Sequence, residues 1–86
     1  MWGFDDAERE LLISATTHLR ELRGLVDRAE RRADLYDGIW IVRASVDELD
    51  EMYDLVQALM DGTRSRRKLE QLEGMLATLC TSMDGF

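Results

Sequence analysis

The chain has 86 residues, of which 45% are hydrophobic and 34% are charged, a balance that excludes both a disordered chain and a membrane-embedded one. A chain of this length forms one domain at most, so residues 1–86 are predicted to be a single helical domain. The net charge of -7 argues against direct binding of nucleic acid or of anionic membranes, since neutralising phosphates requires an excess of lysine and arginine.

The N-terminus, MWGFDDAERE, is acidic and lacks the apolar segment of a secretory signal. The longest apolar run, residues 39–42, is far shorter than the roughly 20 residues of a membrane span. The single cysteine, Cys80, excludes an internal disulfide and is expected to be a small core residue, the alternative being a disulfide between two chains. These features predict a cytoplasmic protein that does not associate with membranes.

The strongest periodic pattern lies in residues 12–36. Apolar or small residues recur there at every third and fourth position, which is the heptad pattern of a coiled-coil-like helix. Asp5 and Glu8 have the spacing of a capping box at a helix start. One long helix is therefore predicted from about Asp6 to Tyr36. Its interaction seam comprises Leu12, Ala15, Leu19, Leu22, Val26, Ala29, Ala33 and Tyr36.

A turn signal at residues 37–38 is followed by the β-branched and aromatic residues of a short strand, at 39–43. In an otherwise helical chain this strand would have to pair with another copy of itself or with a partner's edge. The alternative is an extended linker whose Trp40 side chain plugs the helical bundle. Residues 2–4, with two aromatic side chains, either fold back onto the first helix or stay flexible.

Two more helices are predicted after this segment. The first begins with a second capping box, formed by Ser45 and Glu48, and runs to about Met60. A tight connection at 61–63 leads into the last helix, at about 64–83, and its shortness predicts an antiparallel hairpin.

The predicted fold class is all-α: a long N-terminal helix packed on an antiparallel helical hairpin, in a three-helix, coiled-coil-like arrangement, with the short strand at 39–43 left open. A helix of about 30 residues would be roughly 45 Å long, longer than either helix of the hairpin. The uncovered part of the seam predicts a homodimer or a higher oligomer. The alternative is a break near Gly24 that gives a compact monomeric bundle.

No motif in the sequence is typical of catalysis or of cofactor binding. The only histidine is His18, the sequence contains none of the Glu-x-x-His motifs of a di-metal bundle, and the chain has no glycine-rich phosphate loop. The carboxylates fall on a predicted solvated helix face, where they keep ordinary acidity. We therefore expect a protein that is not an enzyme and that carries no metal or other cofactor.

Two charged clusters are candidate functional surfaces. The acidic one is either a solvated helix face or a docking surface for a basic partner. Its residues are Asp47, Asp50, Glu51 and Asp54. The basic one lies at the start of the last helix, where positive charge opposes the helix dipole. Its side chains either form salt bridges with the acidic face of a second subunit, remain solvated, or bind an anion together with the free backbone N–H groups. This candidate anion site comprises Thr63, Ser65, Arg66 and Arg67.

The predicted function is that of a small acidic helical module that acts through protein–protein interaction and self-association. One alternative is an acidic inhibitor that mimics nucleic acid and binds a basic partner. A second is an anion- or phosphate-binding module that uses the turn at 63–68.

Overall fold

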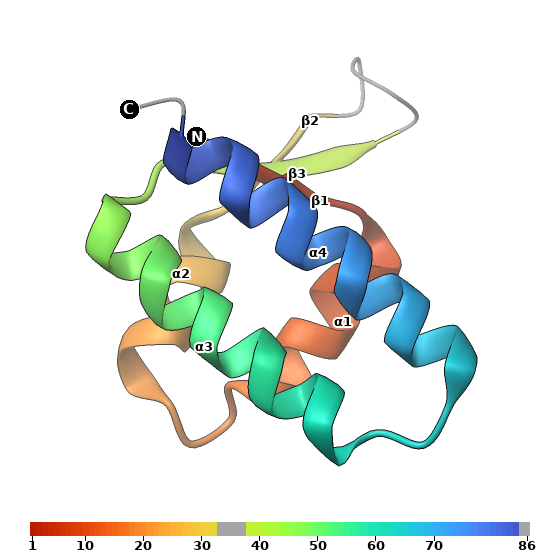
Figure 1. Cartoon of the computed structure of the whole chain (residues 1–86). Coiled ribbons are helices and arrows are strands. Elements are labelled where there is room, and N and C mark those ends of the chain that lie inside the picture. Colours follow the sequence, from red (N-terminus) through yellow and green to blue (C-terminus); the bar gives the residue numbers. More distant parts are fainter. Residues whose placement is uncertain (33–37, 85–86) are drawn as a thin grey trace. The chain divides into compact units, whose positions relative to one another are not determined.

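The structure, a computed structural model, describes residues 1–32 and 38–84. In chain order its elements are β1 (Trp2–Phe4), α1 (Asp6–Ala15), α2 (Arg20–Arg28), β2 (Glu30–Arg32), β3 (Ile39–Val42), α3 (Val46–Gly62) and α4 (Arg66–Asp84) (Figure 1). Contacts divide the chain into two compact units, residues 1–44 and residues 45–86.

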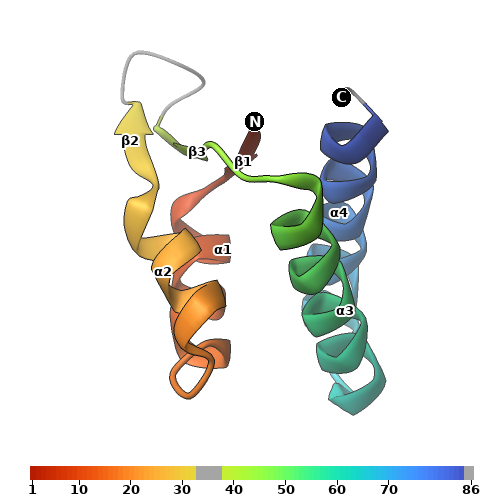
Figure 2. The same ribbon diagram turned by 90° about the vertical axis from the view of Figure 1, so that its left-hand side faces the viewer.

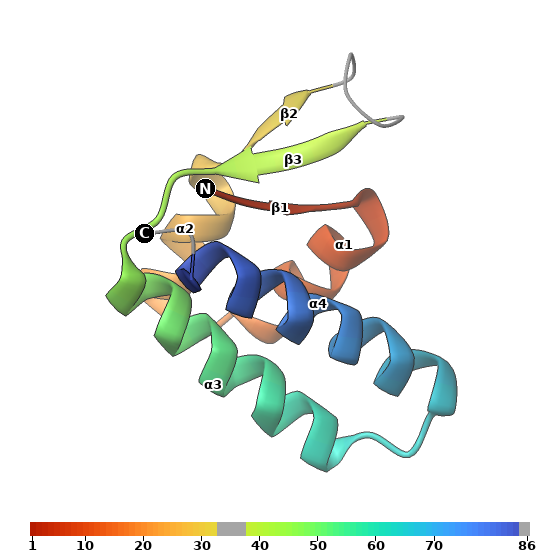
Figure 3. The same cartoon turned by 45° about the horizontal axis from the view of Figure 1, so that its top comes forward.

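The prediction of an all-α fold is wrong, because residues 1–44 contain a three-stranded antiparallel sheet and the fold is mixed α/β. Strand β3 lies between β1 and β2 (Figure 3). The short strand at 39–43 that the sequence left open is present as β3. It pairs within its own chain, with β1 and β2, so the expectation that it needs another copy or a partner's edge is also wrong.

The single long helix predicted from Asp6 to Tyr36 is absent, and α1, a turn, α2 and β2 replace it over the described residues 6–32. At the end of α1, the Thr16 hydroxyl donates a hydrogen bond to the Leu12 carbonyl at 2.7 Å. The Thr17 hydroxyl likewise donates to the Ser14 carbonyl at 3.0 Å. Two β-branched residues whose hydroxyls compete for helix carbonyls favour a helix end, so the break falls here rather than near Gly24.

A strand follows α2 where the heptad pattern had predicted further helix. Ala29 ends α2 in an extended conformation, with φ -64° and ψ 139°. Glu30 and Arg32 then stand opposite Ile41 and Ile39 in the β2–β3 pair. Pairing with a strand later in the chain overrides the local helical pattern, because the ladder satisfies the backbone of both segments.

The core of residues 1–44 lies against one face of this sheet. Trp2 and Val42 are directly opposite each other and both are buried. The rings of Trp2 and Phe4 are 4.9 Å apart and tilted by 53°, a favourable aromatic geometry. The other buried residues of this unit lie on α1, on α2 or directly after one of these helices. They are Leu12, Thr16, Leu22, Leu25, Val26 and Ala29.

Residues 45–86 contain the predicted antiparallel hairpin, with α3 and α4 side by side (Figure 2). The capping box of Ser45 and Glu48 is confirmed, as is the one at Asp5 and Glu8. Buried residues recur at spacings of three and four on each helix. They are Leu49, Met52 and Val56 on α3, and Leu72, Met75 and Leu79 on α4. Cys80 is exposed, so its prediction as a core residue is wrong.

Candidate functional site

The sheet of residues 1–44 has two unlike faces. Side chains alternate along a strand, so Ile39 and Ile41 point away from the face of Trp2 and Val42. A Cβ placed on Gly3 would lie 3.2 Å from the Ile39 side chain, so Gly3 belongs to this second face as well. We call it the open face, because its side chains are exposed or half-buried. Its residues are Gly3, Glu30, Arg32, Ile39 and Ile41.

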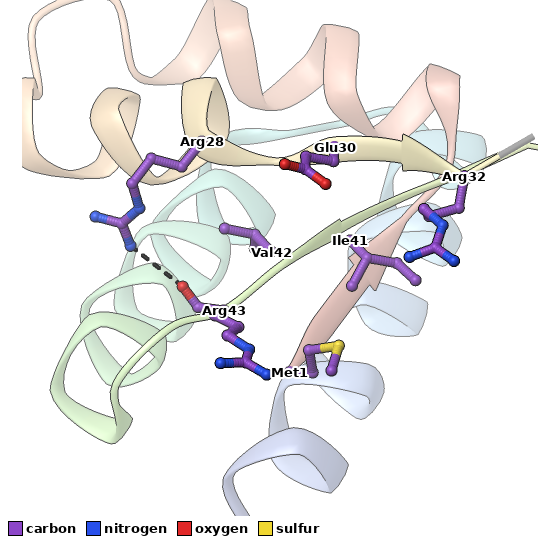
Figure 4. Close-up of a pocket in the computed structure, with 7 residues that line it drawn as sticks. All are labelled: Met1, Arg28, Glu30, Arg32, Ile41, Val42 and Arg43. Atoms are coloured by element: carbon purple, nitrogen blue, oxygen red, sulfur yellow. Dashed lines mark hydrogen bonds between the residues drawn. The ribbon is translucent and has the colours of Figure 1, made fainter.

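A groove of about 410 Å³ lies on the open face (Figure 4). It is lined by Met1, Arg28, Glu30, Arg32, Ile41, Val42 and Arg43. Three guanidinium groups and one carboxylate therefore border a floor that includes Ile41. The lining is cationic, although the chain as a whole has a net charge of -7.

The arginines of the groove come from three different parts of the chain. Arg28 lies in the last turn of α2, where a positive charge suits the helix dipole. Its Nη2 donates to the carbonyl oxygen of Arg43 at 3.3 Å and so ties the end of α2 to the end of β3. Among residues 1–32 and 38–84 the Arg43 guanidinium makes no ion pair. Its donors therefore remain open to a ligand.

The opposite face of the sheet holds a cluster of charged and aromatic groups around Asp6. The Trp40 indole donates to Asp6 Oδ1 at 2.7 Å, and Arg31 Nε lies 3.5 Å from the same oxygen. The Arg9 guanidinium stacks 4.1 Å from the centre of the Trp40 ring. The hydrogen bond from Trp40, together with Arg31, lowers the pKa of Asp6. This cluster fastens the first turn of α1 to the sheet, so Trp40 anchors a helix rather than plugging a helical bundle.

The predicted interaction seam does not form one helical surface. Leu12, Leu22, Val26 and Ala29 are buried and Ala15 is half-buried, whereas Leu19, in the turn between α1 and α2, is 41% exposed. Ala33 and Tyr36 lie outside the described residues. The heptad pattern therefore marks core positions of two short helices.

The predicted acidic residues Asp47, Asp50, Glu51 and Asp54 all lie on α3 and are all exposed. Their spacing of three and four residues places them on one side of the helix. None of these four carboxylates forms an ion pair with another residue in the part of the chain that the structure describes. A row of exposed carboxylates is the ordinary solvent face of an amphipathic helix, so it does not by itself indicate a ligand.

At the predicted anion site, the hydroxyl groups are used in local hydrogen bonds. Thr63 Oγ1 accepts from the Ser65 backbone N–H, and Ser65 Oγ accepts from the Lys68 backbone N–H, both at 3.3 Å. The second bond occupies one of the N–H groups at the start of α4. Arg66 and Arg67 are exposed in the first turn of that helix.

The sequence does not reveal the groove, because the residues that line it lie far apart along the chain. Arg28 and Arg32 were assigned to the C-terminal end of one long helix, where cations are common. A usable signal was the alternation of Ile39, Ile41 and Arg43, which share one side of a strand. Nothing in the sequence indicated that 30–32 would be its neighbour.

Within residues 1–32 and 38–84, no three side chains of the metal-ligating types gather into a metal site. The helices of the same residues are all too short or too polar to cross a membrane. In comparisons with family models, curated proteins and solved structures, no family, relative or structural neighbour matches this chain.

Proposed function

We propose that this chain is a small, non-catalytic protein-interaction module, and that its groove binds an acidic segment of a partner protein. The observation that carries the proposal is the placement of three exposed guanidinium groups, from Arg28, Arg32 and Arg43, around the half-buried Ile41. Guanidinium groups match carboxylates in a planar, two-bonded geometry. The isoleucine side chain adds an apolar contact between them.

The expected partner segment alternates acidic and apolar residues. Carboxylates would meet the arginines, and an apolar side chain would meet Ile41 and Met1, which is 64% exposed. Glu30 stands directly opposite Ile41 and would repel a carboxylate at that point. The groove therefore favours an apolar residue over an acidic one at its centre.

The expected binding is weak and depends on salt. An exposed ion pair contributes only about 0.2–1 kcal/mol, so three of them cannot hold a partner tightly without the apolar contact. Salt screens such pairs, and an interaction of this kind weakens as ionic strength rises. These magnitudes fit a reversible contact rather than a permanent complex.

The test is fluorescence anisotropy with a labelled peptide that alternates glutamate and leucine. A peptide in which glutamine replaces every glutamate is the control ligand. Arg32→Gln/Arg43→Gln should weaken binding of the acidic peptide roughly tenfold, the effect of about 1.4 kcal/mol. Arg20→Gln/Arg64→Gln removes the same charge from exposed positions outside the groove and should leave affinity nearly unchanged. Equal affinity for both peptides would contradict the proposal.

A further inference from the structure

We infer that the acidic segment bound by the groove is the acidic side of α3 in a second copy of the chain, an inference that rests on the function proposed above. This acidic row consists of Asp47, Asp50, Glu51 and Asp54. The groove of one copy would receive the acidic row of another. The contact would make self-association the activity of this module.

The two surfaces match in length. From Asp47 to Asp54 the acidic row extends about 10 Å, at 1.5 Å per residue of helix. From Arg28 to Arg32 the chain extends at most about 13 Å, at 3.3 Å per extended residue. The acidic row and the stretch from Arg28 to Arg32 are thus of the same order of length, so that more than one carboxylate of the row would meet a guanidinium group of the groove.

The two surfaces also match in apolar character. Among the residues that the structure describes, the exposed large hydrophobic side chains are Met1, Leu19 and Val46. Met1 lines the groove, and Val46, 45% exposed, lies one helical turn before Asp50, at the edge of the acidic row. Contact between the groove and the acidic row would bring Met1 and Val46 to the same interface, where both side chains would be buried from solvent.

Charge is divided unevenly between the two units, which favours this contact. Residues 1–44 contain seven basic and nine acidic residues, whereas residues 45–86 contain four basic and nine acidic residues. Two copies repel each other at long range, but salt screens that repulsion beyond about 8 Å at physiological ionic strength. Ion pairs at contact distance are screened less, so local complementarity decides the outcome.

The test is charge reversal with complementation, measured by sedimentation velocity over a wide range of concentrations. One variant, Arg32→Glu/Arg43→Glu, reverses the groove. The other, Asp50→Lys/Glu51→Lys, reverses the acidic row. Each variant alone should associate at least roughly tenfold more weakly than the unmodified chain. An equal mixture should regain association, because the intact groove of one variant meets the intact acidic row of the other.

The matched control is Glu70→Lys/Glu73→Lys, which makes the same charge change at exposed positions of α4. It should not weaken association. If the unmodified chain stays monomeric at every concentration while the acidic peptide still binds the groove, the inference is wrong and the proposed function stands. If the peptide fails to bind as well, both are wrong. Self-association that persists in each reversed variant alone would place the contact elsewhere and overturn the inference.

Discussion

Each of the two units of this molecule is stabilised by a different kind of internal contact. In residues 45–86, α3 and α4 follow each other through a short connection, and their contacts join neighbouring parts of the chain. In residues 1–44, the first strand pairs with the last, so β1 (2–4) meets β3 (39–42). The second arrangement depends on pairing between the two ends of the unit, so substitutions in β1 test it directly.

The largest expected effect comes from the aromatic side chain at the start of β1. Trp2→Ala should lower the free energy of unfolding by about 3–5 kcal/mol, since Trp2 is 1% exposed and its loss leaves a large cavity next to Val42. Chemical denaturation measures the change. Trp2→Phe, which keeps much of the volume, should cost clearly less. A loss below about 1 kcal/mol for Trp2→Ala would show that β1 is not essential to the core.

Alanine substitutions at Gly38 and at Gly74 should change stability in opposite directions. Gly38 has φ +97°, and a Cβ there would collide with the Arg31 side chain that lies near Asp6. Gly38→Ala should therefore cost about 1–2 kcal/mol. Gly74, inside α4, has open space around it, so Gly74→Ala should raise stability by up to about 1 kcal/mol.

Melting temperatures of the two glycine variants check this comparison. The expected result is a lower value for Gly38→Ala and a higher one for Gly74→Ala, relative to the unmodified chain. Gly24→Ala is the control within residues 1–44, because Gly24 is helical and also has open space around it. If Gly38→Ala were as stable as Gly24→Ala, position 38 would not require a glycine.

The Asp6 cluster should make the stability of residues 1–44 sensitive to acid. The pKa of Asp6 is lowered in the folded state, chiefly by the hydrogen bond from Trp40 and then by Arg31. Its contribution is therefore present above the ordinary aspartate pKa of 3.8 and is lost as the pH falls through the lower folded value. In Asp6→Asn, the free energy of unfolding should therefore decrease less steeply as the pH falls below 3.8.

Glu8 should act in the opposite direction. Burial raises the pKa of Glu8 above its ordinary value of 4.5. A raised folded pKa favours the protonated form, so its contribution is present below pH 4.5 and is lost as the pH rises through the folded value. Urea unfolding midpoints of Asp6→Asn, Glu8→Gln and the unmodified chain, measured from pH 3 to 7, distinguish the contribution of Asp6 from that of Glu8. Identical pH profiles for both variants would contradict this assignment.

The smallest expected effect belongs to an exposed ion pair. Arg23 Nε lies 3.1 Å from Asp27 Oδ1 on α2, and both side chains are more than a third exposed. Asp27→Asn should change the free energy of unfolding by only about 0.3–0.5 kcal/mol, and less in high salt. A change above about 1 kcal/mol would show that this pair does more than join adjacent turns of one helix.

The same difference between local and long-range contacts explains how much of the structure of each unit could be predicted from the sequence. Ser45 and Glu48 cap α3 as their spacing predicts, and the buried residues of α3 and α4 recur at the helical spacing of three and four. These features depend on residues within a few positions of one another. Periodicity and capping signals are sufficient for such elements.

The sheet could be predicted only in part. The composition of 39–43 indicated a strand, but its neighbours at 2–4 and 30–32 showed no comparable signal. The second of these lay inside a convincing heptad pattern, which the long-range pairing overrode. The groove was hidden for the same reason, since Arg32 and Arg43 share a surface only after β2 and β3 pair.

The measurement that tests the central proposal most directly is a titration of the isotopically labelled chain with the acidic peptide, followed by the amide and arginine Nε signals in NMR spectra. The proposal predicts the largest shifts at Arg32, Ile41 and Arg43, with little change in Arg32→Gln/Arg43→Gln. No shift on the open face, or larger shifts at Arg66 and Arg67 than in the groove, would contradict the assignment of the open face as the binding surface.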